Sequence, residues 1–334
     1  MTTSLQTQSP ALDFQAAVAL AARLDAEVGR VIIGQNQARR EILLCLLSGG
    51  HVLLRGVPGL AKTLLIRTLA DAVSLRFGRI QFTPDLMPSD IVGTEVIEED
   101  PATGRRSVRF IPGPIFANIL LADEINRTPP RTQAALLEAM QEYQVTVGGV
   151  RHELERPLFV LATENPIEQE GTHPLPEAQL DRFMMNVIME YPKLEEERRI
   201  LAETTTGAPF TVDPVATGED LEAARALVRA LPAASNVVDQ ALRLVRSTRP
   251  GDASAPEEAR RWIEWGAGPR AGQSLVIGAK ALALLEGRKV PTPQDVDAVA
   301  LPVLRHRVLL NFHAQAEGVT PDQVIGRLLA SARA

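Results

Sequence analysis

Cysteine is almost absent from this chain of 334 residues, since Cys45 is the only one. A single thiol excludes an intramolecular disulfide framework and a cysteine-based zinc site, and it is typical of a reducing compartment. The five histidines are scattered, without the spacing of metal ligands. We therefore expect a cytoplasmic protein whose fold depends on an apolar core.

Basic residues are also too few for an excess of positive charge. The chain has 35 Lys and Arg against 41 Asp and Glu, a net charge of −6. Binding to nucleic acid needs cations that neutralise phosphates, so this balance predicts no nucleic-acid partner. No apolar run approaches the ~18 residues of a membrane span, and the start of the chain lacks the basic segment of a signal peptide. We expect no direct insertion into a membrane.

Aromatic residues make up only 4% of the chain, whereas alanine and leucine are abundant, which favours helices over a β-sandwich. The length leaves room for two domains with separate cores. Helical patterns alternate with strand-like runs at residues 51–55, 79–82, 117–122, 158–163 and 186–189. This alternation predicts a doubly wound parallel sheet of five strands, with the functional site at the carboxyl edge of the strands.

A glycine-rich loop follows the first of these runs and leads into a helical pattern. The loop comprises Gly56, Val57, Pro58, Gly59, Leu60, Ala61, Lys62 and Thr63, and Leu64 follows it. Such a loop lets backbone N–H groups surround phosphates, and the dipole of the next helix favours the same anion. Lys62 is expected to bind the β- and γ-phosphates of ATP, and Thr63 to ligate Mg²⁺. Ala61 stands where a second glycine is usual. In isolation the loop could be an ordinary turn.

Two carboxylates, Asp123 and Glu124, follow the apolar run that begins at Ile119. At the tip of a buried parallel strand, Asp123 would hold Mg²⁺ through its water shell. Glu124 would polarise the attacking water, a role that contributes about 10²–10⁴-fold. The alternative is a strand end with two solvated acids, which the preceding phosphate loop disfavours.

Two further polar residues complete the predicted site. Asn165 follows the fourth strand-like run, where its amide could hydrogen-bond both the attacking water and the γ-phosphate; taken alone, Asn-Pro is simply a turn. Arg182 precedes the last strand-like run. There it could enter the site of an adjoining subunit as an arginine finger, worth roughly 10³–10⁵ in rate. Its alternative is a surface ion pair with Asp181.

From about Leu24 onward the chain resembles the MoxR family of AAA+ ATPases. The resembling strings are Ile33-Gly34-Gln35, the phosphate loop, and residues 122–127, 133–140, 162–166 and 175–183. The resemblance implies a P-loop AAA+ core with a helical lid, hydrolysis of Mg-ATP between the subunits of a homo-oligomeric ring, typically a hexamer, and a chaperone-like role. It also implies a protein partner with a von Willebrand factor A domain. Ala61 is common in the family, and Gly34 would allow close approach of the adenine.

Two inserts interrupt the core and are expected to set specificity. The first, residues 84–114, is predicted to hold a short helix at 88–92 and a β-hairpin. The second is a hairpin in which β-branched residues flank Gly148-Gly149. The resemblance makes them the helix-2 insert and the pre-sensor hairpin. We favour substrate or partner contact for the first insert; the alternative is that both only decorate the fold.

The expected organisation is a disordered tail (1–12), the AAA+ core (13–192), a linker with a connecting helix (193–218) and an all-α lid (219–334). Within the lid, Arg270 stands at the start of a long helical pattern. Alone it would be a solvated charge, but the resemblance assigns it as the residue that senses the γ-phosphate.

Three functions remain open. The first is an ATP-driven remodeller that matures or activates another protein. Insertion of a metal cofactor into that protein is one form that this activity could take. The second is the motor subunit of a metal chelatase, and the third is a switch in which ATP only controls assembly. Glu124, Asn165 and Arg182 argue against the switch, since it does not need a full hydrolytic set.

Overall fold

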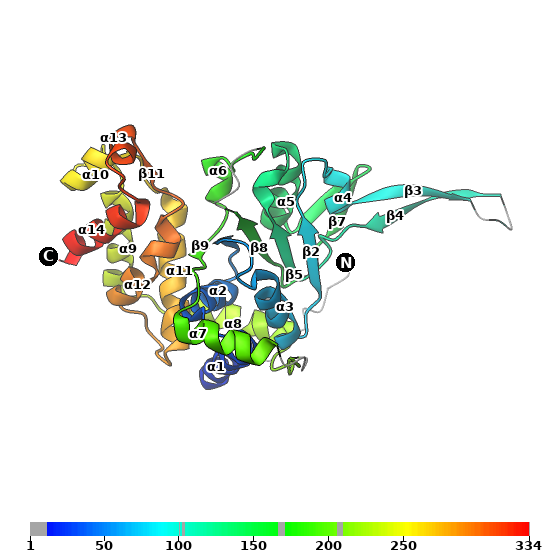
Figure 1. Ribbon diagram of the computed structural model, residues 1–334, viewed down its shortest axis with the longest axis horizontal. Coiled ribbons are helices and arrows are strands. Elements are labelled where there is room, and N and C mark those ends of the chain that lie inside the picture. Colours follow the sequence, from blue (N-terminus) through cyan, green and yellow to red (C-terminus); the bar gives the residue numbers. More distant parts are fainter. Residues whose placement is uncertain (1–11, 100, 102–103, 166–170, 206–209, 334) are drawn as a thin grey trace, which may run out of the picture.

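The computed structural model describes residues 12–99, 101, 104–165, 171–205 and 210–333. The tail expected at residues 1–12 lies outside this range except for Leu12, and residues 206–209 of the expected linker (193–218) also lie outside it. Figure 1 shows a sheet-containing core joined to a helical domain at the left, with one long hairpin extending to the right.

A sheet of five parallel strands forms the centre of the core, in the order β2-β5-β8-β1-β9. Its strands are β1 (Val52–Arg55), β2 (Phe77–Gln81), β5 (Ile119–Asp123), β8 (Phe159–Glu164) and β9 (Met185–Ile188). The predicted five-stranded parallel sheet is therefore confirmed. β5, β8 and β1 are buried along almost their whole length, as their apolar runs predict.

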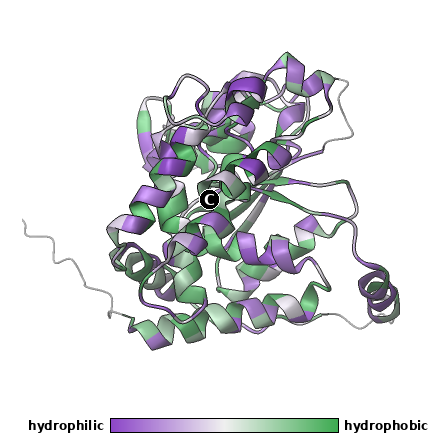
Figure 2. Ribbon diagram, turned by 90° about the vertical axis from the view of Figure 1, so that its left-hand side faces the viewer, coloured by the Kyte–Doolittle hydropathy of each residue, from purple (hydrophilic) through white to green (hydrophobic). Residues whose placement is uncertain are grey.

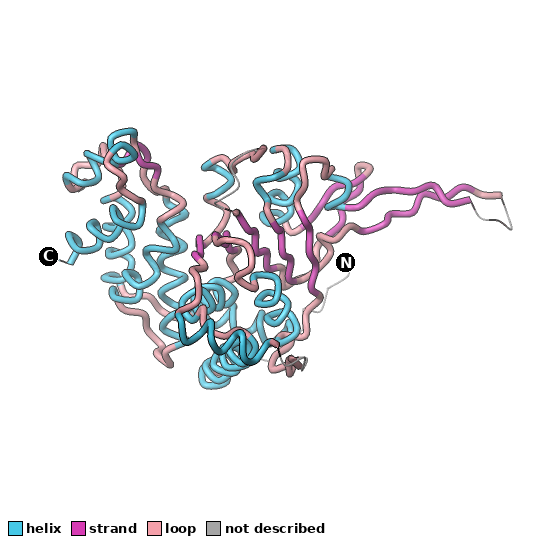
Figure 3. Tube along the Cα trace, in the orientation of Figure 1, coloured by secondary structure: helices cyan, strands magenta, loops and turns pink. Residues whose placement is uncertain are grey.

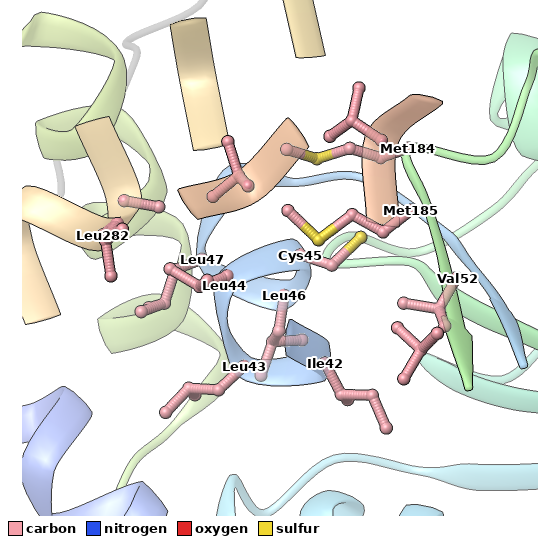
Figure 4. Packing of buried hydrophobic residues seen from close by; sticks show 14 of the residues in the cluster. Ile42, Leu43, Leu44, Cys45, Leu46, Leu47, Val52, Met184, Met185 and Leu282 are labelled. Atoms are coloured by element: carbon pink, nitrogen blue, oxygen red, sulfur yellow. The ribbon is translucent and has the colours of Figure 1, made fainter. Parts of the chain in front are cut away.

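Of the helices around the sheet, α2 (Asn36–Ser48) and α3 (Lys62–Ala72) contact its strands, and α5 (Pro130–Glu142) shares a hydrophobic cluster with β5 and β8. α1 (Phe14–Val31) packs against α2 and α3. Asp13 caps α1 by accepting a hydrogen bond from the Ala16 amide at 2.7 Å. α2 is apolar on every side from Ile42 to Leu47 because it lies between the sheet and the helical domain. Figure 4 shows these side chains between Met185 of β9 and Leu282 of the helical domain.

Both inserts fold as expected. α4 (Pro88–Val92) leads into the antiparallel strands β3 (Gly93–Glu99) and β4 (Arg106–Pro112), which form the extended arm in Figures 1 and 3. The second hairpin pairs β6 (Gln144–Val147) with β7 (Val150–Glu153). The ring of Phe110 stacks on His152 with centroids 3.9 Å apart, so the base of the arm is anchored to the second hairpin.

Short elements connect these parts: the 3₁₀ helix η1 (Ile125–Arg127), α6 (Glu177–Leu180) and α7 (Leu194–Thr204). α7 has no buried residue, and Figure 2 shows it standing apart from the body at the lower right. Elsewhere in Figure 2 the apolar faces of the helices turn inward.

The C-terminal part is the predicted helical lid. It contains α8 (Gly218–Ala230), α9 (Ser235–Ser247), α10 (Glu257–Trp262), α11 (Pro269–Leu285), α12 (Pro293–Leu304), α13 (Phe312–Ala316) and α14 (Pro321–Arg333). One feature was not predicted: β10 (Ile263–Trp265) and β11 (Leu309–Leu310) pair antiparallel within it. Within the described residues, no helix is both long and apolar enough to cross a membrane.

Candidate nucleotide-binding site

The glycine-rich loop runs from the end of β1 to the start of α3, and its two glycines are needed for different reasons. Gly59 has a φ of +87°, which glycine adopts without strain. At Gly56 a Cβ would lie 3.0 Å from the backbone oxygen of Met189, so a side chain there would fit only if the neighbouring backbone moved. Ala61 also has a left-handed backbone, with φ 59°. The usual glycine at this position is thus explained, and Ala61 holds a conformation that costs about 1–3 kcal/mol in a non-glycine residue.

The loop opens onto a cavity of about 490 Å³. Every described residue that lines it belongs to a motif already identified in the sequence: Pro58, Gly59, Ala61, Lys62, Thr63, Leu64, Asp123, Glu124 and Asn165. The carboxyl ends of β1, β5 and β8 meet here because the strands are parallel and adjacent in the sheet.

Lys62 is half-buried at the first turn of α3, and its Nζ donates a hydrogen bond to the backbone oxygen of Gly56. Burial lowers the pKa of Lys62, while the charges of Asp123 and Glu124 oppose that shift. An ammonium ion held in a partly desolvated loop is a strong partner for phosphate oxygens.

Asp123 is held on both sides by neighbouring strands. Its Oδ2 accepts a hydrogen bond from Arg79 of β2 at 2.6 Å, and its Oδ1 accepts one from the Thr163 hydroxyl of β8 at 2.7 Å. The same hydroxyl accepts a hydrogen bond from the Glu124 amide at 2.8 Å. Thr163, which is fully buried, therefore fixes the positions of both acids.

Glu124 leaves the strand in a left-handed conformation, with φ 58°. Its Oε2 accepts hydrogen bonds from Gln81 at 2.8 Å and from Arg127 at 2.9 Å. Arg127, whose role the sequence left open, thus forms an ion pair with Glu124. These two donors hold the Glu124 carboxylate in place at the mouth of the cavity.

Sequence reasoning missed Arg79, Gln81 and Thr163. Gln81 is aligned with Asp123 in the pairing of β2 with β5. The available signal for Gln81 and Thr163 was that each lies at or near the carboxyl end of a predicted strand, whereas Arg79 is the first residue of its predicted strand and gave no such signal. Asn165 was found, and it is buried beside Glu164, whose carboxylate accepts a hydrogen bond from Arg55 at 2.7 Å.

Gly34 lies beside a second cavity of about 500 Å³, whose lining includes Gln35, Glu41, Glu196 and Asp322. Its φ is +71°, and a Cβ there would lie 2.7 Å from the Glu196 carboxylate. The left-handed backbone favours glycine at this position, since any other residue would be strained there. Burial raises the pKa of Glu41, which accepts a hydrogen bond from Gln37 at 2.7 Å.

Arg182 and Arg270 are not among the described residues that line the phosphate-loop cavity. Arg182 lies half-buried just after α6. Asp181, the alternative partner considered for Arg182, is bound instead by two lid arginines, Arg307 at 2.7 Å and Arg270 at 3.3 Å. In this conformation Arg270 therefore reaches the core at Asp181 rather than at the phosphate loop.

Comparisons with known proteins agree with this geometry. Residues 51–185 match the family model of the ATPase family associated with various cellular activities (AAA), and residues 257–328 match the AAA lid domain. The chain is 44% identical over 309 residues to Chaperone MoxR1 of Mycobacterium tuberculosis, covering 91% of this chain and 79% of the relative. It is 34% identical over 316 residues to Protein MoxR of Paracoccus denitrificans, covering 89% and 91% of the two chains.

A solved structure from Cytophaga hutchinsonii, assigned as an ATPase, superposes with a TM-score of 0.87 at 39% identity and covers 95% of each chain. The phosphate loop, the two acids at the tip of β5 and the helical lid are thus found within a chain that matches MoxR relatives over nearly its whole length. The protein belongs to the MoxR family of AAA+ ATPases.

Proposed function

We propose that this protein hydrolyses ATP and uses the energy to remodel, mature or activate a partner protein. The observation that carries the proposal is the phosphate-loop cavity, which unites Lys62, Thr63, Asp123, Glu124 and Asn165. A phosphate-binding cation, a pair of acids and an amide around one cavity form the set that hydrolysis of a phosphoanhydride needs.

In this proposal each side chain has one task. Lys62 binds the β- and γ-phosphates, Glu124 accepts a proton from the attacking water, and Asn165 orients that water against the γ-phosphate. Thr163 positions Asp123 and Glu124 through its two hydrogen bonds.

Magnesium fits the oxygen donors of the cavity. The Thr63 hydroxyl and the Asp123 carboxylate both line it, and hard oxygen donors are the ligands that Mg²⁺ prefers. The described part of the chain contains no group of three or more His, Cys, Asp or Glu that could hold a metal ion. The ion would therefore bind together with ATP, and it would neutralise charge on the phosphates.

We further propose that the active form is a homo-oligomeric ring, a hexamer by family likeness, in which Arg182 acts on the nucleotide of a neighbouring subunit. The position of Arg182 outside the lining of its own cavity supports this. The similarity to Chaperone MoxR1 supports a chaperone-like role. A protein with a von Willebrand factor A domain is the proposed binding partner. The extended arm of β3 and β4 is the proposed contact surface for a client.

Steady-state ATP hydrolysis and nucleotide affinity test the enzymatic part. Lys62→Ala should lose most affinity for ATP, whereas Glu124→Gln should bind Mg-ATP and hydrolyse it at least ~10²-fold more slowly. Glu142→Gln, an exposed acid at the end of α5, is the matched control and should keep full activity. Normal turnover in Glu124→Gln would place the general base elsewhere.

The remodelling part is tested by trapping. Tagged Glu124→Gln protein with ATP should retain a client or partner that Lys62→Ala protein does not retain under the same conditions. Equal recovery with both variants would mean that capture does not depend on ATP binding, and it would remove the support for ATP-driven remodelling.

A further inference from the structure

Three arginines surround a small pocket at the edge of the core opposite the phosphate loop. The pocket has a volume of about 150 Å³, and its lining includes Tyr143, Arg156, Arg225 and Arg229. Gly49, which also lines it, comes before β1, and Arg156 comes before β8. The pocket therefore lies at the amino ends of these strands, about 13 Å from the phosphate loop by the length of β1.

Arg225 is the buried member of the three, with 7% of its surface exposed. Its Nε donates a hydrogen bond to the backbone oxygen of Leu46 at 2.9 Å, and its Nη1 donates one to Glu222 at 2.7 Å. Its Nη2 is buried and has no hydrogen-bond partner within the described chain. A buried neutral donor without an acceptor lowers the stability of the fold by about 1–3 kcal/mol, and a charged donor lowers it by more.

Arg156 and Arg229 add two more guanidinium groups from other elements. Arg156 stacks on the ring of Tyr143, 4.3 Å from its centroid, which fixes its plane. Arg229 lies over Gly49, where its Nη2 would be 3.3 Å from a Cβ. Among the described residues of the lining, Glu222 is the one acidic side chain, so three positive charges face one negative charge.

Capping of a helix explains only part of this arrangement. The bond from Arg225 to Leu46 satisfies a carbonyl near the end of α2, where the helix dipole favours a cation. In that role Arg225 uses its Nε, and its Nη2 still has no hydrogen-bond partner within the described chain. It also gives no reason for Arg156, which belongs to the segment before β8 and not to the helix that carries Arg225.

We propose that this pocket binds the phosphate group of a small molecule. Guanidinium groups in a fixed plane match the geometry of phosphate oxygens, and a phosphate would balance the surplus positive charge of the three arginines that line the pocket. The pocket has room for one such group and is separate from the ATP site. Two sources share this chemistry, inorganic phosphate and the terminal phosphate of a nucleotide.

Isothermal titration calorimetry with inorganic phosphate tests the proposal. The full-length Lys62→Ala protein is the background, because this substitution weakens the phosphate loop as a competing site. Saturable binding with one phosphate per chain is expected. Arg156→Gln and Arg229→Gln, made in that background at exposed positions, should each weaken binding about tenfold or more. Arg260→Gln in the lid is the matched control and should not change it.

Titration with AMP distinguishes the two sources. AMP binding more tightly than inorganic phosphate, with the same dependence on Arg156 and Arg229, would identify a nucleotide. Equal affinities would identify phosphate alone. Absence of saturable binding of either probe, or binding that both Gln variants leave unchanged, would overturn the proposal whatever the ATPase activity of the wild-type protein.

Discussion

The carboxylate of Asp181 joins the core to the lid through Arg307. Arg307 Nε donates to Asp181 Oδ1 at 2.7 Å, and the arginine side chain is only 2% exposed. The same guanidinium group donates to the backbone oxygens of Phe183 and Met184 at the entrance to β9. Asp181 immediately precedes Arg182, so these contacts tie the lid to the segment that carries the proposed arginine finger.

Asp181→Asn should lower the free energy of unfolding by about 1.5–3 kcal/mol, because Arg307 would lose its charged acceptor while staying buried. Urea unfolding followed by circular dichroism measures this change. Glu99→Gln, which breaks an exposed ion pair with Arg106 in the arm, is the control and should cost less than about 1 kcal/mol. A loss no larger than that of the control would mean that the Asp181–Arg307 pair does not contribute to stability.

Thr163→Val should slow ATP hydrolysis with little effect on ATP affinity. The substitution keeps the shape of the side chain but removes the hydroxyl that holds Asp123 and Glu124 together. Thr163→Ser keeps the hydroxyl and should restore most of the rate. The measurement is kcat for both variants beside the Kd for ATP. If Val and Ser variants hydrolyse ATP equally, the hydroxyl does not position the acids.

Ala61→Gly should raise the free energy of unfolding by about 1 kcal/mol, since glycine adopts the left-handed backbone at this position without strain. Ala202→Gly in α7 is the comparison. That residue is in an ordinary helix, so the same change should lower stability by about 0.5–1 kcal/mol. Thermal and urea unfolding of both variants provide the test, and opposite signs are the expected result.

Stability should fall as the pH drops from 6.5 towards 4, partly because of His51. Burial, together with the smaller effect of the positive charge of Arg225, lowers the pKa of His51 to about 4. The Val160 amide donates to His51 Nδ1 at 3.1 Å, so Nε2 carries the proton and faces the Met140 oxygen. Between pH 4 and 6.5 the unfolded chain binds a proton that the folded chain does not, and stability therefore rises with pH in this range.

His51→Gln removes this contribution. Its loss of stability between pH 7.5 and pH 5 should be about 2 kcal/mol smaller than that of the wild type. His313→Gln, at an exposed position in α13, is the control and should show the wild-type difference. An unchanged pH dependence in His51→Gln would show that this histidine is not the group responsible.

Mixing of inactive subunits tests the ring. Arg182→Ala subunits keep Glu124 but supply no finger, and Glu124→Gln subunits have the reverse defect. In a random 1:1 mixture, about a quarter of the interfaces in a closed head-to-tail ring would pair an intact Glu124 with an intact Arg182. ATPase activity should reappear and peak near equal amounts. Fluorescence transfer between labelled subunits confirms exchange, and exchange without recovery would exclude Arg182 as a finger in trans.

Short patterns of neighbouring residues in the sequence were enough to predict the sheet, both hairpins and the residues of the phosphate-loop cavity. The reason is that Gly56, Lys62 and Asp123 belong to contiguous patterns in which an apolar strand leads into a polar turn. Those patterns are set by neighbours in sequence. The left-handed backbone at Ala61 could likewise be suspected from the glycine that usually stands there.

Only the tertiary structure decided which other residues hold the site together. Arg79, Gln81 and Thr163 are ordinary strand residues in the sequence, and they meet Asp123 and Glu124 because β2 and β8 flank β5. Arg270 and Arg307 lie far from Asp181 along the chain and reach it through the packing of the lid. The arginines of the opposite pocket come together for the same reason: contacts between distant elements depend on how strands and helices pack, which local patterns do not specify.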